Sequence, residues 1–503
     1  MSETTTAAAS GGGVTYQSVD SSYFEKRGLR RYAGVASLWA LGVGAVISGH
    51  FSGWNFGLGV GGWGGMLIAT VFIAIMYLGL TFSIAEMSPA LPHTGAAYSF
   101  ARSTMGPWGG FITGLCENVE YVITPAVIVF FIGSYLGSIF GTSESFQPVY
   151  WIGGYIVFVG LNVVGVELSF KVTLVVTLLA LACLVGFWFS AIPNMDFTRW
   201  ALNIGVGADG APVELAEGGG SFLPFGLHGA LAAMPFAVWL FLAIEQLPLA
   251  AEESVDPKRD MPRGIILGII TLIISAFMIL LLNASIAKGA FALSTSGEPL
   301  LDGFRAIYGD GIAKILALIA VIGLIASFHT IIFAQGRQIY SLSRAGYFPR
   351  ALSITHGTRK TPHLAMVAGA VVALIVMCVI WYGVANSAAI IGGTLLNMAV
   401  FGAMISYIMQ ALSFILLRKK FPQIARPYKS PFGVVGAVLT MLIALVTIYF
   451  QLSDPVYRAG VIGVAIWFAV GIIYFALVGR HKLVLSPEEE FARSKGTAEY
   501  KSL

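Results

Sequence analysis

The sequence predicts an all-α membrane protein with twelve transmembrane helices, and three observations lead to this prediction. Of the 503 residues, 57% are hydrophobic and only 11% are charged, whereas a soluble domain carries about 25% charged residues. The apolar residues form runs of about 20, the length that a helix needs to cross a bilayer. The runs are too long and too continuously apolar for the alternating strands of a β-barrel.

Twelve such runs follow one another, and each is expected to be one helix. A glycine-rich turn at 57–62 separates the first two, Pro148 opens the fourth, Pro193 ends the fifth and Pro362 opens the ninth. The runs cover roughly 34–57, 62–83, 107–138, 149–168, 171–192, 229–251, 263–287, 312–341, 363–384, 388–416, 432–452 and 457–479.

The lysines and arginines predict the orientation of the helices, because cytoplasmic loops of membrane proteins are enriched in both. With the N-terminus in the cytoplasm, the basic residues that fall on the outer side are Arg199, Lys288, Arg305, Lys314 and Arg458, out of 29. Both termini are therefore expected in the cytoplasm, which requires an even number of spans. The expected location is the inner or plasma membrane of the cell, with membrane lipid around the bundle.

One membrane domain accounts for most of the chain. Residues 1–33 are rich in Ser, Thr, Ala and Gly and are expected to form a disordered cytoplasmic tail. Residues 34–480 form the transmembrane domain, and residues 481–503 form a cytoplasmic C-terminal tail. The longest outer loop, about 193–228, is too short to be a further domain.

The same sequence argues against several other functions. The net charge is +4 and no basic patch is dense enough to bind a nucleic acid. No HExxH, GxSxG or Walker motif is present, so an enzyme is not expected. Cys116, Cys183 and Cys378 lie in separate apolar runs without the spacing of metal ligands. Neither a metal nor a cofactor is predicted.

Two of the runs do not suit a continuous helix. Residues 42–53 (GVGAVISGHFSG) bring four glycines, two serines and a histidine into the first run, and residues 235–248 (PFAVWLFLAIEQLP) bring two prolines and a glutamate into the sixth. Glycine costs about 1 kcal/mol and proline about 3 kcal/mol inside a helix. Breaks in spans 1 and 6 are typical of inverted repeats around a central binding site. Close packing of small residues and a plain proline kink are the alternatives.

Polar residues in other runs are candidates for the same site, because a charge at a helix centre costs about 2.5–3.5 kcal/mol. One face of the third run carries Thr113, Glu117, Glu120, Tyr121 and Thr124. The sixth, eighth and tenth runs add Glu245, Ser327, His329, Thr330 and Asn397. A helix–helix hydrogen bond is the structural alternative for each. No lysine or arginine lies midway along any run, so the site is expected to favour a cation.

Several motifs resemble those of the amino acid–polyamine–organocation permeases. Residues 86–98 (EMSPALPHTGAAY) resemble that family's loop after span 2, and residues 106–114 (GPWGGFITG) the stretch that follows it. Residues 251–263 (AEESVDPKRDMPR) resemble the signature after span 6, which is the most specific piece, and residues 336–346 (GRQIYSLSRAG) the end of span 8. The likeness runs from about residue 34 to residue 480.

This resemblance implies a LeuT-like fold. Two five-helix repeats, about 34–192 and 229–416 here, are inverted relative to each other, and helices 11 and 12 follow at 432–479. Spans 1 and 6 would clamp the substrate, and spans 3, 8 and 10 would complete the cavity. Within the family, residues 46–55 (VISGHFSGWN) are most similar to the ethanolamine permeases.

The sequence departs from the family pattern at three places. His50 stands in the Gly-x-Gly segment of span 1, and Ala243 replaces the glycine of the span 6 break. Some proton-coupled members have a lysine midway along span 5, whereas residues 172–192 contain no charge.

These features predict the chemistry of the substrate. Free carbonyls at the end of a half-helix, acidic side chains and aromatic faces all suit an ammonium group. His50 stands where amino-acid carriers offer N–H groups to a carboxylate, so it is expected to occupy that position and, with Ser48, to bind a hydroxyl. Ethanolamine, an amine without a carboxylate, fits. The predicted substrate-binding residues are Ile47, Ser48, Gly49, His50, Glu120, Tyr121, Trp239, Phe241 and Glu245. The predicted coupling or gating residues are Glu117, Trp239, Ser327, His329 and Thr330.

The main functional prediction is a secondary active transporter that imports a small amine by alternating access, coupled to a proton (a symporter) or to a counter-solute. An amino-acid or polyamine permease or exchanger of the same fold is the alternative. A channel is less expected, because no filter-like repeat is present. A sensor is less expected, because both tails are too short for a signalling domain.

Overall fold

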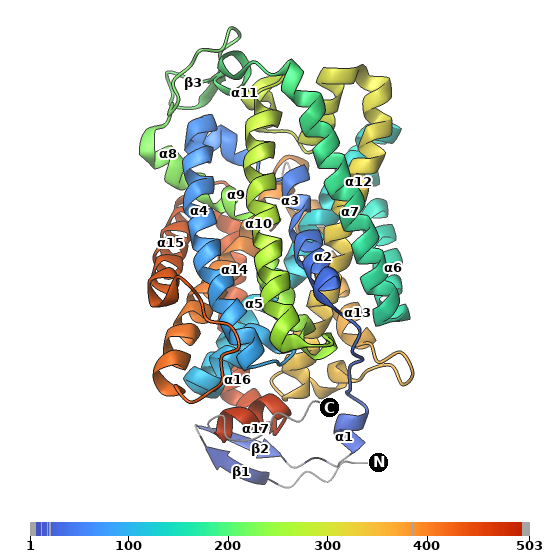
Figure 1. Cartoon of the computed structure of the whole chain (residues 1–503). Coiled ribbons are helices and arrows are strands. Elements are labelled where there is room, and N and C mark those ends of the chain that lie inside the picture. The colour runs from blue at the N-terminus through green and yellow to red at the C-terminus, as the bar shows by residue number, and fades with distance from the viewer. Residues whose placement is uncertain (1–6, 12, 18, 20–21, 385–386, 495–503) are drawn as a thin grey trace.

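Figure 1 shows a computed structural model in which long helices form one bundle. The structure describes residues 7–11, 13–17, 19, 22–384 and 387–494. Strands β1 and β2 and helix α17 lie at one end of the bundle, called the tail end below, and strand β3 lies at the other, called the loop end. Ten helices of the described part are long and apolar enough to cross a membrane. The predicted all-α membrane architecture is therefore confirmed.

The helices, in chain order, are α1 (Ser22–Glu25), α2 (Val35–Val46), α3 (Ser48–Phe51), α4 (Phe56–Ala90), α5 (Ala96–Phe140), α6 (Gln147–Val164), α7 (Val166–Ala191), α8 (Gly226–Ala232), α9 (Met234–Val238), α10 (Pro257–Ala284), α11 (Gly289–Leu293), α12 (Pro299–Arg344), α13 (His363–Gly383), α14 (Ser387–Lys420), α15 (Gly433–Ser453), α16 (Arg458–Leu477) and α17 (Pro487–Arg493). The tighter or wider helical segments are η1 (Glu144–Phe146), η2 (Ile192–Asn194), η3 (Phe197–Ala201), η4 (Ile244–Glu253), η5 (Arg350–Ser353) and η6 (Gly479–His481). The strands are β1 (Ala7–Gly11), β2 (Val14–Gln17), β3 (Ile204–Val206), β4 (Pro212–Glu214) and β5 (Leu483–Val484).

Two of the twelve predicted runs are not continuous helices. The first, 34–57, is divided into α2 and α3 with a turn at Ile47. The sixth, 229–251, is divided into α8, α9 and η4, with turns at 239–243. These are the two runs for which the sequence predicts a break.

Two helices begin well before the apolar runs that predict them. Helix α5 starts at Ala96 and is bent at Gly106 (φ 80°), and α12 starts at Pro299 and is bent at Gly309 (φ 76°). The segments before the bends are rich in polar residues, so a search for apolar runs does not include them. Glycine suits both bends, because the left-handed region strains other residues.

The bundle has a buried centre and an apolar outer surface. Helix α5 packs against α14 and α12, and α10 packs against α4 and α2. The outer helices α6, α7, α13, α15 and α16 expose large apolar side chains, such as Ile156 and Phe189, which are 70% and 73% exposed. A soluble monomer rarely exposes so much contiguous apolar surface, so this surface is that of an integral membrane protein.

The described part of residues 1–33, for which the sequence predicts a disordered tail, contains strands β1 and β2. Strand β2 pairs antiparallel with β1 and parallel with β5, with Tyr16 opposite Leu483. The side chain of Tyr16 is buried. Composition indicates disorder because the segment is short and polar, but its partner lies at the other end of the chain.

Candidate functional site

The break in the first span is made by a side chain from α12. In an uninterrupted helix the N–H of Ser48 would donate to the carbonyl of Gly44. Here the N–H of Ser48 donates to Oγ of Ser327 at 2.8 Å, and the Ser327 hydroxyl donates to the Gly44 oxygen at 2.6 Å. Insertion of a side chain into the hydrogen-bond ladder is a known cause of helix breaks. Ser327, predicted as a gating residue, therefore bridges the break between α2 and α3.

The break in the sixth span is turned by Ala243, which has a φ of 83°. This is the left-handed region, which costs residues with a Cβ about 1–2 kcal/mol. Strained backbone tends to persist at functional sites, where the surrounding structure holds it.

We therefore expect Ala243→Gly to raise the free energy of unfolding by about 1 kcal/mol, because glycine adopts this conformation without a steric penalty. The matched control is Ala237→Gly in α9, which should lower it by about 1 kcal/mol. Thermal unfolding of the purified variants in detergent measures both. An Ala243→Gly variant that unfolds at a lower temperature than the parent would contradict the strain at this position.

His50 connects the two breaks rather than presenting a free nitrogen. Its Nε2 lies 3.0 Å from the carbonyl oxygen of Leu240, and its Nδ1 lies 2.9 Å from the hydroxyl of Ser275 in α10. A carbonyl only accepts, so Nε2 carries the proton, and in the neutral ring Nδ1 accepts from Ser275. Both nitrogens are therefore occupied, and the predicted hydrogen bond from His50 to a substrate hydroxyl is not available in this conformation. The ring instead connects α3 with the sixth span and with α10 through hydrogen bonds.

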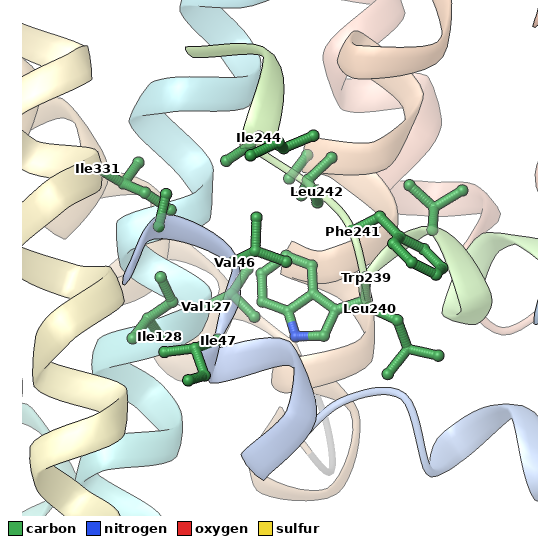
Figure 2. Packing of buried hydrophobic residues seen from close by; sticks show 14 of the residues in the cluster. Val46, Ile47, Val127, Ile128, Trp239, Leu240, Phe241, Leu242, Ile244 and Ile331 are labelled. Atoms are coloured by element: carbon green, nitrogen blue, oxygen red, sulfur yellow. The ribbon is translucent and has the colours of Figure 1, made fainter. Parts of the chain in front are cut away.

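The side chain of Trp239, which belongs to the break in the sixth span, extends toward the break in the first span. Figure 2 shows its indole between the segment of Val46 and Ile47 and the segment of Leu240 to Leu242. The indole Nε1 donates to the carbonyl of Ser52 at 3.0 Å. A Cβ on Gly49 would lie 2.1 Å from the Trp239 carbonyl oxygen, so the two backbones meet here. This contact explains why residue 49 is glycine.

Three glutamates converge beside these breaks. Glu117 and Glu120 on α5 and Glu245 on η4 are each at most 2% exposed. The three carboxyl groups are close enough to act on one another electrostatically. Neither oxygen of Glu117 or Glu245, nor Oε2 of Glu120, makes a hydrogen bond of regular geometry within the described chain, although the carboxyl groups of Glu120 and Glu245 lie close enough to each other to share a proton. The structure thus brings predicted acids of spans 3 and 6 together, and their role as the substrate's counter-charge stays a prediction.

Aromatic residues surround these acids. Tyr407 of α14 donates to Oε1 of Glu120 at 3.4 Å, and its hydroxyl lies 3.0 Å from that of Tyr77 in α4. Tyr77 in turn packs against Phe241, with ring centroids 5.4 Å apart. Tyr121 is fully buried, and its hydroxyl has no partner among the described residues. Together they form an acidic and aromatic cluster.

Sequence reasoning missed Tyr77, Tyr407 and Ser275. Tyrosine and serine are ordinary residues in an apolar run, so nothing in the local pattern marks them. The one available signal is that the hydroxyls of Tyr77 and Tyr407 need a polar partner when they are buried.

The remaining predicted residues serve helix packing in this conformation. The ring nitrogens of His329 lie 3.0 Å from Asn162 of α6 and 3.1 Å from Ser169 of α7. Thr330 donates to carbonyls of its own helix, and its methyl group packs near Gly44. Ile47 is fully buried and belongs to the hydrophobic cluster that Figure 2 shows in part. Asn397 in α14 bonds to Gln451 of α15 rather than to the cluster.

The glutamates of motif 251–263 lie at the tail end of the bundle and bind α12. Glu253 pairs with Arg337 at 2.7 Å and Glu252 with Arg344 at 2.8 Å. Burial opposes ionisation of Glu252, but Arg344 and the N–H of Thr94 together outweigh it and hold the pKa of this carboxyl below its usual value. For Glu253, burial outweighs Arg337, so the pKa is raised. The motif therefore clamps the end of the sixth span to α12.

Known proteins resemble this chain over most of its length. A family model for amino acid permeases matches residues 38–485. An uncharacterized transporter from Rhizobium meliloti is 28% identical over 84% of this chain and 86% of its own length. A methylthioribose transporter from Bacillus subtilis is 24% identical over 92% of this chain and 96% of its own. A branched-chain amino acid permease from the same organism is 24% identical over 90% and 94%.

The family match includes both broken spans, the glutamate cluster and the motif that clamps α12. The chain therefore belongs to the amino acid permease family, whose members are integral membrane proteins that transport small molecules.

Proposed function

We propose that this chain is a secondary active transporter that imports a small amine, with ethanolamine as the first candidate. The observation that carries the proposal is the set of buried carboxylate oxygens on Glu117, Glu120 and Glu245 that make no regular hydrogen bond in the described chain. A buried carboxylate is costly unless it is neutralised by a proton or paired with a cation. A small ammonium compound supplies that charge and up to three N–H donors.

The aromatic neighbours support the same substrate class. The phenol groups of Tyr77, Tyr121 and Tyr407 lie close to these acids, and aromatic faces attract cations. Trp239 lies over the first break and is our candidate for the gate. The N–H of Ser48 is already bonded to Ser327, and both ring nitrogens of His50 are bonded to Leu240 and Ser275. A substrate carboxylate therefore finds fewer free N–H donors here than in a segment made only of glycines. This favours an amine that has no carboxylate.

An amino acid is the second candidate. The observation that favours it is the likeness to a branched-chain amino acid permease over nearly the full length of both proteins.

We further propose twelve spans arranged as two inverted five-helix repeats. The breaks in the first and sixth runs support this arrangement, as do the bends at Gly106 and Gly309, which fall in α5 and α12 at corresponding places of the two halves. The bias of lysine and arginine supports a cytoplasmic location for the tail end.

Uptake into proteoliposomes tests the substrate. Labelled ethanolamine should accumulate with saturable kinetics and should be competed by unlabelled ethanolamine better than by serine, choline, putrescine or leucine. Uptake measured with and without a pH gradient distinguishes proton symport from exchange. Leucine or serine competing better than ethanolamine would instead establish the amino-acid alternative.

Two variants sharpen this test. His50→Gly should weaken ethanolamine uptake and admit serine or alanine, because it exposes the backbone donors that a carboxylate needs. Ser275→Ala removes the partner of Nδ1 but keeps the ring, so it should keep the parent's selectivity. Unchanged selectivity in His50→Gly would show that this residue does not determine the substrate.

A further inference from the structure

The C-terminal helix α17 inserts two glutamates into the tail end of the bundle. Glu489 is fully buried and accepts from Arg102 Nε at 2.6 Å, from the Tyr347 hydroxyl at 2.9 Å and from the Tyr16 hydroxyl at 2.6 Å. Arg102 belongs to α5, and Tyr347 follows α12 directly. One carboxylate from the tail therefore joins α5, the end of α12 and strand β2.

The neighbouring Glu488 extends this connection to the broken sixth span. It is fully buried and pairs with Arg344 at 3.1 Å. Arg344, the last residue of α12, pairs at the same time with Glu252, next to the end of η4. Arg344 thus connects the tail with the broken span that holds the glutamate cluster.

Backbone contacts fix the tail against the same place. The N–H of Val484 donates to the carbonyl of Ala345 at 2.9 Å. A Cβ on Gly346 (φ 84°) would lie 2.4 Å from the carbonyl oxygen of Lys482, so the two chain segments approach closely. Strand β2 covers the other edge, with Tyr16 opposite Leu483 and Gln17 opposite Val484.

These contacts lie where an alternating-access transporter has to open. Release of substrate at the tail end requires the ends of α5, α12 and η4 to separate, and the pairs of Arg102 with Glu489 and of Arg344 with Glu488 and Glu252 hold these ends together. A buried ion pair holds firmly while both partners are present, and loss of one partner leaves an unpaired buried charge. The tail therefore bears directly on the equilibrium between the closed and open states of this end.

We propose that residues 483–493, together with strand β2, form a tail latch that holds the tail end closed and must release in each transport cycle. The latch rests on the proposed transport by alternating access but does not depend on which substrate is carried. Its strength sets how often the tail end opens, so any change that frees the tail from Arg102 and Arg344 accelerates opening.

Hydrogen–deuterium exchange on the full-length purified protein without substrate tests the latch. In the double variant Glu488→Gln/Glu489→Gln, amides near residues 98–104 and 340–347 should exchange at least about tenfold faster, because local opening becomes easier. Amides of α7 should keep the parent's rates. The matched control is Glu490→Gln, which changes the same type of residue on the exposed face of the same helix and should leave all rates unchanged.

Tyr16→Phe is the second variant, since it removes one donor to Glu489 and keeps the ion pair with Arg102. It should raise exchange in the same peptides by a smaller factor. In proteoliposomes both variants should transport faster than Glu490→Gln at saturating ethanolamine. Exchange at 98–104 and 340–347 that stays at the control level in both variants would overturn the latch, and so would a rise spread evenly over the bundle. Because exchange is measured without substrate, this result is independent of the ethanolamine proposal.

Discussion

Replacing Glu120 and Glu245 together by glutamine is expected to lower kcat/KM for amine uptake about 100-fold, because loss of one partner of a buried charge pair costs about 3 kcal/mol. The thermal stability of the variant should be unchanged or higher. Within the described chain these carboxyl groups lack regular hydrogen bonds for most of their oxygens, and glutamine is neutral, so the substitution removes no ion pair among the described residues. A loss of function without a loss of stability separates a substrate-binding acid from a structural one.

Initial uptake rates over a range of substrate concentrations, together with thermal unfolding in detergent, measure the two quantities. The matched control is Glu214→Gln, an exposed glutamate in β4, which should change neither. The single variants show which acid contributes more. An affinity like the parent's in the double variant would rule out these two residues as the counter-charge. A clear drop in the unfolding temperature would assign them a structural role instead.

Some of this site is predictable from sequence because its residues violate local rules. Glycines, prolines and glutamates inside an apolar run are unfavourable in a lipid-embedded helix. The breaks near Ile47 and Trp239 and the acids of α5 and η4 therefore stand out in the amino-acid sequence itself. Motif 251–263 stands out likewise, because its charges end an apolar run abruptly.

Other parts of the site depend on partners that no local pattern reveals. The small residues around His50 in the sequence predict a substrate ligand, yet its two nitrogens are taken by Leu240 and Ser275, about 190 and 225 residues away in the chain. His329 lies in the expected helix but faces α6 and α7. Which face of a helix points inward is set by packing, and a nearly uniform apolar run gives little guidance on it.

The order of the N-terminal tail is unpredictable for the same reason. Tyr16 is buried because it bonds to Glu489, at a sequence separation of 473 residues. A composition rich in Ser, Thr, Ala and Gly describes the tail in isolation, whereas its structure depends on the C-terminal segment. The tail latch therefore emerges only when both ends of the chain are seen together.

Among substitutions at the site that add a single methyl group, Gly49→Ala is expected to lower stability and uptake the most. The new Cβ would lie 2.1 Å from the carbonyl oxygen of Trp239 and 3.0 Å from its carbonyl carbon. Both atoms belong to backbone, so no flexible side chain can move aside. Overpacking of this kind costs about 3 kcal/mol, and the strain falls on the two broken spans that we propose hold the substrate. We expect a lower unfolding temperature and a loss of most uptake.

The matched control for this substitution is Gly186→Ala in α7, where a Cβ meets no atom within 4 Å. Alanine is favoured over glycine inside a helix by about 1 kcal/mol, so this variant should be slightly more stable than the parent and fully active. The substitution of glycine by alanine should then lower the stability at residue 49 and raise it at residue 186. The two effects differ because the backbone of the first span contacts that of the sixth span only at Gly49 of this pair. Unfolding temperature and uptake that remain at parental values in Gly49→Ala would mean that the two breaks do not touch in the resting protein. The clamp between spans 1 and 6 would then have to form only when substrate binds.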